Sequence, residues 1–152
     1  MSGGISVTIK VRMIDNDIPD EIEKIKDKLD DFGPVFKKAK DDLKTLWKNN
    51  FLENGLPSGG WKPLDAEYGS WKSVHFPGAP PMIRSGKLFK SLSDLRGNPN
   101  NIDKKEATFG TNVKYADFHQ SGTSKMPART IVFVTDRYER KWADDAAEHA
   151  QG

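Results

Sequence analysis

The sequence contains no cysteine, which excludes disulfides, thiolate nucleophiles and cysteine-ligated metal sites together. It also lacks any apolar run approaching the roughly 20 residues that a membrane-spanning helix requires. The first residues, 1–4, lead directly into an alternating segment and show no secretory signal. We therefore expect a soluble protein that is made in the cytoplasm, is not exported by the classical route and has no membrane partner.

The chain has little excess charge of either sign. It carries 24 basic and 22 acidic side chains, a formal net charge of +2, and the bases are scattered along the chain. This distribution argues against a dedicated nucleic-acid surface, although a channel lining that touches DNA in passing remains compatible with it. Apolar residues are also few, at 36% of the chain. A length of 152 residues predicts one domain, 1–152, either an ordinary small polar domain or one that gains stability by binding neighbours.

Two periodic segments open the chain. Apolar residues alternate with polar ones over 5–14, which predicts a half-buried strand. Over 18–54 they recur every three or four residues, which predicts a long amphipathic helix, kinked or split at Gly33-Pro34. The same spacing fits a coiled coil, but Phe32, Phe36 and Trp47 are bulky for a two-stranded seam. Packing of the helix across a sheet is the better interpretation.

The remaining elements are shorter. Residues 56–83 combine prolines, glycines and aromatics without periodicity, which predicts a long loop. A short helix is expected over 85–95 and an amphipathic helix over 136–150. Between them, within 102–135, we expect strands at 102–110, 113–116 and 130–135. The prediction is an α+β fold: one domain with an antiparallel or mixed sheet of about four strands packed by the long N-terminal helix.

The side chains offer little catalytic chemistry. His75, His119 and His149 have no partner at the i+3 or i+4 spacing of a helical metal pair, so we expect no metal and no cofactor. His119, with Asp117 and Arg129 nearby, is the best general-base candidate and would suit a phosphate-directed hydrolase. No nucleophile sits in a recognisable elbow, which favours a protein that is not an enzyme, in which His119 and Gln120 bond a loop together or take part in an interface.

Phosphate and nucleic-acid signals are similarly sparse. The glycines at 58–61 lack the lysine and hydroxyl of a phosphate-binding loop, and Ser85-Gly86-Lys87 is better explained as a helix start. Aromatics lie among bases over 61–72 and could stack on single strands. A small nucleic-acid-binding module therefore remains an alternative, although burial of this loop or a subunit contact explains the aromatics better.

The order of short motifs is more informative than any one of them. Gly60-Trp61-Lys62-Pro63-Leu64 is followed by the segment 81–92, PMIRSGKLFKSL, and then by Phe109-Gly110-Thr111. Tyr115-Ala116, His119-Gln120-x-Gly122 and Pro127-Ala128-Arg129 complete the series. In this order, over 51–134, the chain resembles the phage virion morphogenesis family, the tail-completion proteins, and more distantly the neck proteins of long-tailed phages. Ile83 to Ser85 stand where the family often has leucine and threonine.

The resemblance implies a structural protein of the virion, at the tail end or neck, that completes the tail and prepares the head–tail joint. Such proteins assemble as rings, hexameric by resemblance, through head-to-tail contacts between copies. The implied partners are further copies of the chain and tail-tube or head–tail connector proteins. The 56–83 and 122–126 loops are expected to reach those partners, and Arg129 is expected to pair with a carboxylate. The candidate contact residues are Trp61, Pro63, Tyr68, Tyr115, His119, Gln120, Gly122, Pro127 and Arg129.

Overall fold

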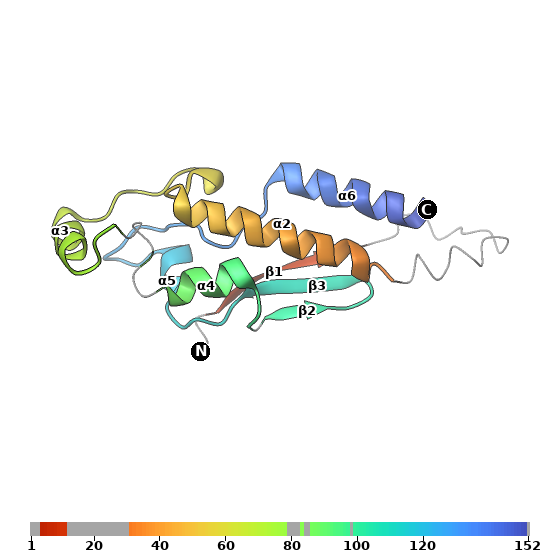
Figure 1. Cartoon of the computed structure of the whole chain (residues 1–152), viewed down its shortest axis with the longest axis horizontal. Coiled ribbons are helices and arrows are strands. Elements are labelled where there is room, and N and C mark those ends of the chain that lie inside the picture. Colours follow the sequence, from red (N-terminus) through yellow and green to blue (C-terminus); the bar gives the residue numbers. More distant parts are fainter. Residues whose placement is uncertain (1–3, 12–30, 79–82, 84–85, 98, 152) are drawn as a thin grey trace.

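The computed structural model describes residues 4–11, 31–78, 83, 86–97 and 99–151. These residues form an α+β structure, as predicted, and their sheet has three strands rather than about four. The strands are β1 (Ile5–Lys10), β2 (Asn100–Ile102) and β3 (Glu106–Thr111), in the order β1-β3-β2, and both pairings are antiparallel. β3 is therefore the central strand (Figure 1).

β1 confirms the strand predicted from the alternation at the start of the chain. Ile5, Val7 and Ile9 are partly buried and pack against the core, while the side chains between them are exposed. Its partner β3 contains Gly110, where an added Cβ would collide with the backbone of β1. This close approach explains why a strand interior contains a glycine, which otherwise weakens strands. The part of the prediction that covers 12–14 lies outside the described residues.

Of the helix predicted over 18–54, kinked or split at Gly33-Pro34, the structure describes residues 31–54. Residues 31 and 32 are not helical, and helix α2 (Gly33–Leu52) begins at the Gly33-Pro34 pair. Proline in the first turn loses nothing, because its missing N–H would have no intrahelical acceptor there. The pair therefore starts a helix and does not kink one. Residues 18–30 lie outside the described residues.

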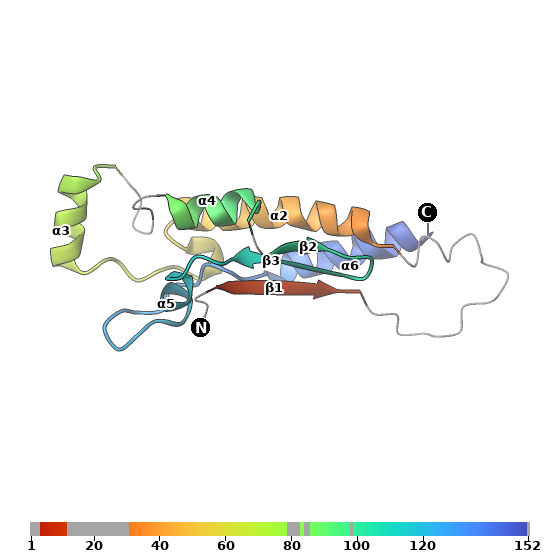
Figure 2. The same ribbon diagram turned by 90° about the horizontal axis from the view of Figure 1, so that it is seen from below.

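The predicted loop 56–83 contains two elements. A 3-10 turn, η2 (Leu56–Ser58), follows α2, and a ten-residue helix, α3 (Ala66–His75), lies further on. The Asp65 side chain caps α3 by accepting a hydrogen bond from the Glu67 N–H. α3 buries only Lys72 among its residues, so it has no apolar stripe that periodicity could detect. It lies at one end of the molecule, away from the sheet (Figures 1 and 2).

In the second half of the chain, the structure differs from three predicted strands. The strand expected at 102–110 is divided between β2 and β3, which are joined by a turn where the Asp103 N–H donates to the Glu106 carbonyl. Residues 113–116 do not form a strand: they turn into the short helix α5 (Ala116–Ser121). Residues 130–135 are not a strand either, for a reason given below. Helices α4 (Lys87–Asp94) and α6 (Asp136–Gln151) confirm the predictions for 85–95 and 136–150.

The core lies between the helices and the sheet. α2 and α4 lie over one face of the sheet, and α6 runs alongside α2 (Figures 1 and 2). The largest fully buried apolar side chains come from α2, the α4 region, β3 and the segment after α5: Phe36, Leu43, Trp47, Phe51, Leu92, Leu95, Phe109 and Ile131. The sheet, the three helices and that segment therefore share one hydrophobic core.

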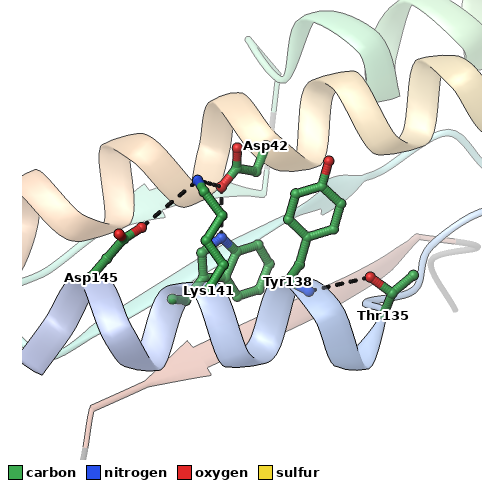
Figure 3. Close-up of polar contacts among 6 residues, drawn as sticks. Asp42, Thr135, Tyr138, Lys141 and Asp145 are labelled. Atoms are coloured by element: carbon green, nitrogen blue, oxygen red, sulfur yellow. Dashed lines mark hydrogen bonds and ion pairs between the residues drawn. The ribbon is translucent and has the colours of Figure 1, made fainter.

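One carboxylate fastens α6 to α2. Asp42 on α2 accepts from Lys141 Nζ at 2.7 Å and from Trp142 Nε1 at 2.9 Å (Figure 3). Trp142 is buried, and a buried indole N–H needs a hydrogen-bond partner, which Asp42 provides at the edge of the core. The hydrogen bond from Lys141 to Asp42 raises the pKa of that lysine. The predicted amphipathic face of α6, with Tyr138, Trp142 and Ala146, is the face that packs against the core.

Candidate interaction site

A buried segment without regular structure, residues 130–134, lies between α2 and α5; it is called the extended segment below. Side chains bind its carbonyl groups. Trp47 Nε1 donates to the Phe133 carbonyl at 2.8 Å, and both Asn50 Nδ2 (2.9 Å) and Trp61 Nε1 (2.8 Å) donate to the Thr130 carbonyl. Trp61, a predicted contact residue, is thus partly buried and turned inward, and it packs edge-on against Phe51.

Gln120 binds the same segment from the opposite side. Its Oε1 accepts from the Ile131 N–H (2.8 Å) and the Val132 N–H (3.0 Å), and its Nε2 donates to the Val132 carbonyl at 2.7 Å. These bonds replace those that a neighbouring strand would make. Because buried backbone groups need partners, the segment can stay inside without joining the sheet. The expected loop-bonding role is therefore confirmed for Gln120.

Arg129 precedes the extended segment and is only 5% exposed. Its Nε donates to the Lys62 carbonyl and its Nη2 to the Pro63 carbonyl, both at 3.0 Å. The expected pairing with a carboxylate is therefore wrong among the described residues: the guanidinium fixes the chain leading to α3. Burial lowers the pKa of Arg129. Pro63 itself is exposed and contributes its carbonyl.

Residues 116–129 form a helix followed by a loop. α5 ends at Gly122, which has φ +75°, and Thr123 and Met126 form an isolated bridge across the loop. A Cβ on Gly122 would lie 2.7 Å from the Ala128 nitrogen. Glycine is therefore required here both by the backbone conformation and by the close approach of the returning chain. The Arg129 N–H then donates to the His119 carbonyl.

A groove of about 720 Å³ lies between α3, the start of α4, α5 and residues 125–129. Five of the nine predicted contact residues line it: Tyr68, Tyr115, His119, Pro127 and Arg129. The other four, Trp61, Pro63, Gln120 and Gly122, hold the surrounding chain in place. The structure adds lining residues that were not among the predicted contact residues: Leu64, Asp65, Gly86, Lys87, Leu88, Phe89, Phe118, Lys125 and Met126.

His119 lies in the wall of this groove. Its Nδ1 is buried without a hydrogen-bond partner, and its ring meets Tyr115 edge-on with centroids 6.0 Å apart. Burial, and secondarily the charge of Arg129, lower the pKa of His119. Nδ1 is thus enclosed, and no hydroxyl of the described residues lies within hydrogen-bond distance for it to activate. The described residues also contain no group of three or more side chains suited to hold a metal ion.

The exposed face of α3 adds an aromatic surface beside the groove. Tyr68, Trp71 and His75 stack in sequence, with centroid separations of 5.8 and 4.4 Å. Large apolar side chains that are exposed among the described residues all lie near this end, on or beside α2, η2, α3 and α5: Leu52, Leu56, Tyr68, Trp71, Val74, Tyr115 and Phe118. Exposed apolar side chains gathered in one place are typical of interaction surfaces.

No protein-family model matches the chain, and neither a curated protein nor a solved structure matches it significantly. Within the described residues, no helix is both long enough and apolar enough to cross a membrane.

Proposed function

We propose that this chain is a structural phage morphogenesis protein that completes the tail and prepares the head–tail joint, acting through assembly into a ring. The observation that carries the proposal is the convergence of the motifs behind the family resemblance. Segments 60–64, 86–89, 115–122 and 127–129 are distant in sequence, yet they surround one groove or bind the chain beside it.

The same end of the molecule has the character of a contact surface. Phe118 is 55% exposed and Val74 is 75% exposed, although both are large and apolar. Water contact with such side chains is unfavourable, at about 25 cal/mol per Å² of apolar area, so burial against a partner stabilises the bound state. Contacts of this end with further copies and with tail-tube or connector proteins would suit a ring at the tail end or neck of the virion.

Loss of the gene from a phage or prophage tests the function. The expected result is separate heads and tails, or aberrant tail ends, in electron micrographs, together with loss of infectious particles. Complementation with the intact gene should restore assembly. Normal infectious particles from the deletion strain would refute the proposed function.

Point variants test whether the exposed apolar end is responsible. Phe118→Asp should leave the fold intact, because the side chain is exposed, yet fail to complement the deletion. Ala143→Asp adds the same charge to the exposed face of α6, outside this end, and should complement normally. Circular dichroism and thermal unfolding of both variants provide the folding control. Complementation by Phe118→Asp would show that this end is not the contact surface.

A further inference from the structure

Two exposed carboxylates occupy the last two turns of α6. They belong to Asp144 and Glu148, and Ala147 lies beside both on the exposed side of the helix. Neither carboxylate has an ion pair among the described residues, where the ion pairs of this helix are made by Lys141. The end of α6 therefore carries negative charge that its own fold does not neutralise.

The position of these carboxylates is unfavourable within a single copy. Residues four apart lie on the same side of a helix, so Asp144 and Glu148 repel each other. Glu148 also lies in the last turn of α6, at the negative end of the helix dipole, where cations and not anions are stabilising. A cationic surface on another molecule would relieve both effects.

The groove offers cations that lack an acidic partner. Arg129 lines it and is buried, its guanidinium donates to two backbone carbonyls, and no carboxylate of the described chain lies within ion-pair distance. Lys125, an exposed lining residue, has no ion pair in that part of the chain either. Asp65 is the one acid among the described lining residues, and it accepts the Glu67 N–H. Since a buried charge without an opposite charge nearby is unfavourable, the groove favours a carboxylate as ligand.

The apolar part of the groove suits the small side chain between the two acids. Phe118 lies in the groove wall although more than half of its surface is exposed, and Leu64 and Met126 line the same groove. Ala147 leaves room on α6 for an aromatic ring, with a carboxylate on each side of it. A helix that places apolar and charged side chains into such a groove is a recurrent mode of recognition.

The two complementary surfaces lie apart in the fold. The groove is at the end of the molecule that contains α3 and α5, whereas the C-terminal end of α6 points away from it (Figures 1 and 2). α6 is fastened to α2 through Asp42, which accepts from Lys141 and Trp142. The last turns of α6 could therefore reach the groove of the same copy only by leaving α2. Between two copies the surfaces can meet with both folds unchanged.

We propose that the last two turns of α6 of one copy bind in the groove between α3, α4 and α5 of the next copy, with Asp144 and Glu148 facing Arg129 and Lys125. The contact is heterologous, because α6 and the groove are different surfaces, and repetition of such a contact can close a ring. The inference rests on the proposed function, since it names the surfaces that join copies in the ring. Ala143 is turned about 100° from Asp144 around the helix axis, so the contact does not include it.

Photocross-linking from the groove tests this geometry. The full chain with p-benzoylphenylalanine in place of Phe118 is prepared unlabelled and 15N-labelled, mixed in equal amounts, irradiated and digested with trypsin. Trypsin cleaves after Lys141, so the end of α6 is recovered in one peptide, 142–152. The expected result is a cross-link from position 118 to that peptide, with unlabelled and labelled chains joined to each other. Cross-links only within one copy, cross-links only to other peptides, or no cross-link would overturn the proposal.

Two variants, each blocked on one side of the contact, test the pairing itself. Phe118→Asp places a negative charge in the groove, and Asp144→Asn with Glu148→Gln neutralises α6 without changing the size of its side chains. Each variant alone should associate at least about tenfold more weakly than the wild type in sedimentation velocity, because every contact lacks one half. Mixed in equal amounts, the variants should form a 1:1 complex, because the second still has an intact groove and the first an intact α6.

The matched control is Asp41→Asn with Asp94→Asn, which removes two exposed charges from α2 and α4 and should leave association unchanged. Equal weakening by this control, wild-type association of either blocked variant, or a mixture that stays monomeric would refute the pairing. A wild-type chain that remains monomeric at about 1 mM would refute it as well. These measurements use the purified chain, whereas the proposed function is tested by gene deletion, so the two can fail separately.

Discussion

Gln120 permits a quantitative test of how the extended segment is held. Its side chain makes three hydrogen bonds, to the Ile131 N–H, the Val132 N–H and the Val132 carbonyl. Ile131 is fully buried and Val132 nearly so. A protein hydrogen bond contributes about 1 kcal/mol net, and more when its loss leaves a buried group unsatisfied. Gln120→Ala should therefore lower the free energy of unfolding by about 3 kcal/mol.

Urea denaturation followed by circular dichroism measures this change. For a chain of this size, about 3 kcal/mol corresponds to a fall in Tm of about 6–12 °C. Gln120→Met tests the bonds separately from the packing, because methionine retains the length of the side chain but no strong hydrogen-bonding group; a similar loss is expected. Ser121→Ala, which removes an exposed bond to Asp117, is the control and should cost less than about 0.5 kcal/mol.

A small effect would refute this account of the extended segment. If Gln120→Ala lowered the free energy of unfolding by less than about 1 kcal/mol, with an unchanged urea dependence, water or rearranged backbone would have to satisfy these groups. If Gln120→Met were as stable as the wild type, the hydrogen bonds would contribute nothing measurable.

Three further outcomes follow from the geometry. Asp42→Asn should destabilise the protein by about 1 kcal/mol in thermal unfolding, because the bond from Lys141 would lose its charged acceptor; an unchanged Tm would contradict this. The pKa of His119 is lowered in the folded state. The neutral imidazole therefore contributes to stability above the pKa of the unfolded chain, about 6.5, and this contribution is lost as the pH falls through the lowered folded pKa. The free energy of unfolding should therefore fall less between pH 7.5 and about pH 5 in His119→Gln than in the wild type. An equal fall in both proteins would show that titration of His119 does not contribute to acid sensitivity. Gly110→Ala should cost more than about 2 kcal/mol in urea denaturation, because its Cβ would collide with β1, and a mild effect would show that β1 can shift freely.

The elements that the sequence predicted well are those whose burial is visible in local periodicity. β1 alternates, α6 buries one stripe, and α4 follows a glycine in the left-handed conformation, Gly86. α3 was missed because it buries one residue and depends on a cap. Periodicity reports burial, so a helix that projects from the body gives no such signal.

The wrong strands have tertiary causes. At 113–116 the chain turns because the Thr111 hydroxyl accepts the Val113 N–H and the chain then enters α5. At 130–135 the residue types suit a strand, but side chains distant in sequence provide the backbone partners. Composition shows that such a segment is buried, and it cannot show which groups bind its backbone.

The candidate site, like the fold, was predicted only in part. The predicted contact residues include five lining residues of the groove, among them Tyr115 and Arg129, although the motifs carry no information on distances. Phe118 lies between those motifs and is not among the predicted contact residues, because its orientation depends on α5 being a helix; Lys125 lies in the loop that follows α5. Leu64 and Tyr68 follow the Lys62 and Pro63 carbonyls to which Arg129 donates, so these hydrogen bonds fix the path that brings both residues to the groove.

The bonds that hold the extended segment also bear on how the chain folds. Trp47, Asn50 and Trp61 bind carbonyls that lie 86, 80 and 69 residues further along the sequence. Forming a contact at such a separation closes a long loop of chain, which costs entropy and slows folding. During synthesis these carbonyls leave the ribosome at least 69 residues after the side chains that bind them, so the three hydrogen bonds cannot form until then. We expect refolding to be limited by arrival of the extended segment, and expect the nascent chain to need protection from aggregation until residue 134 has emerged.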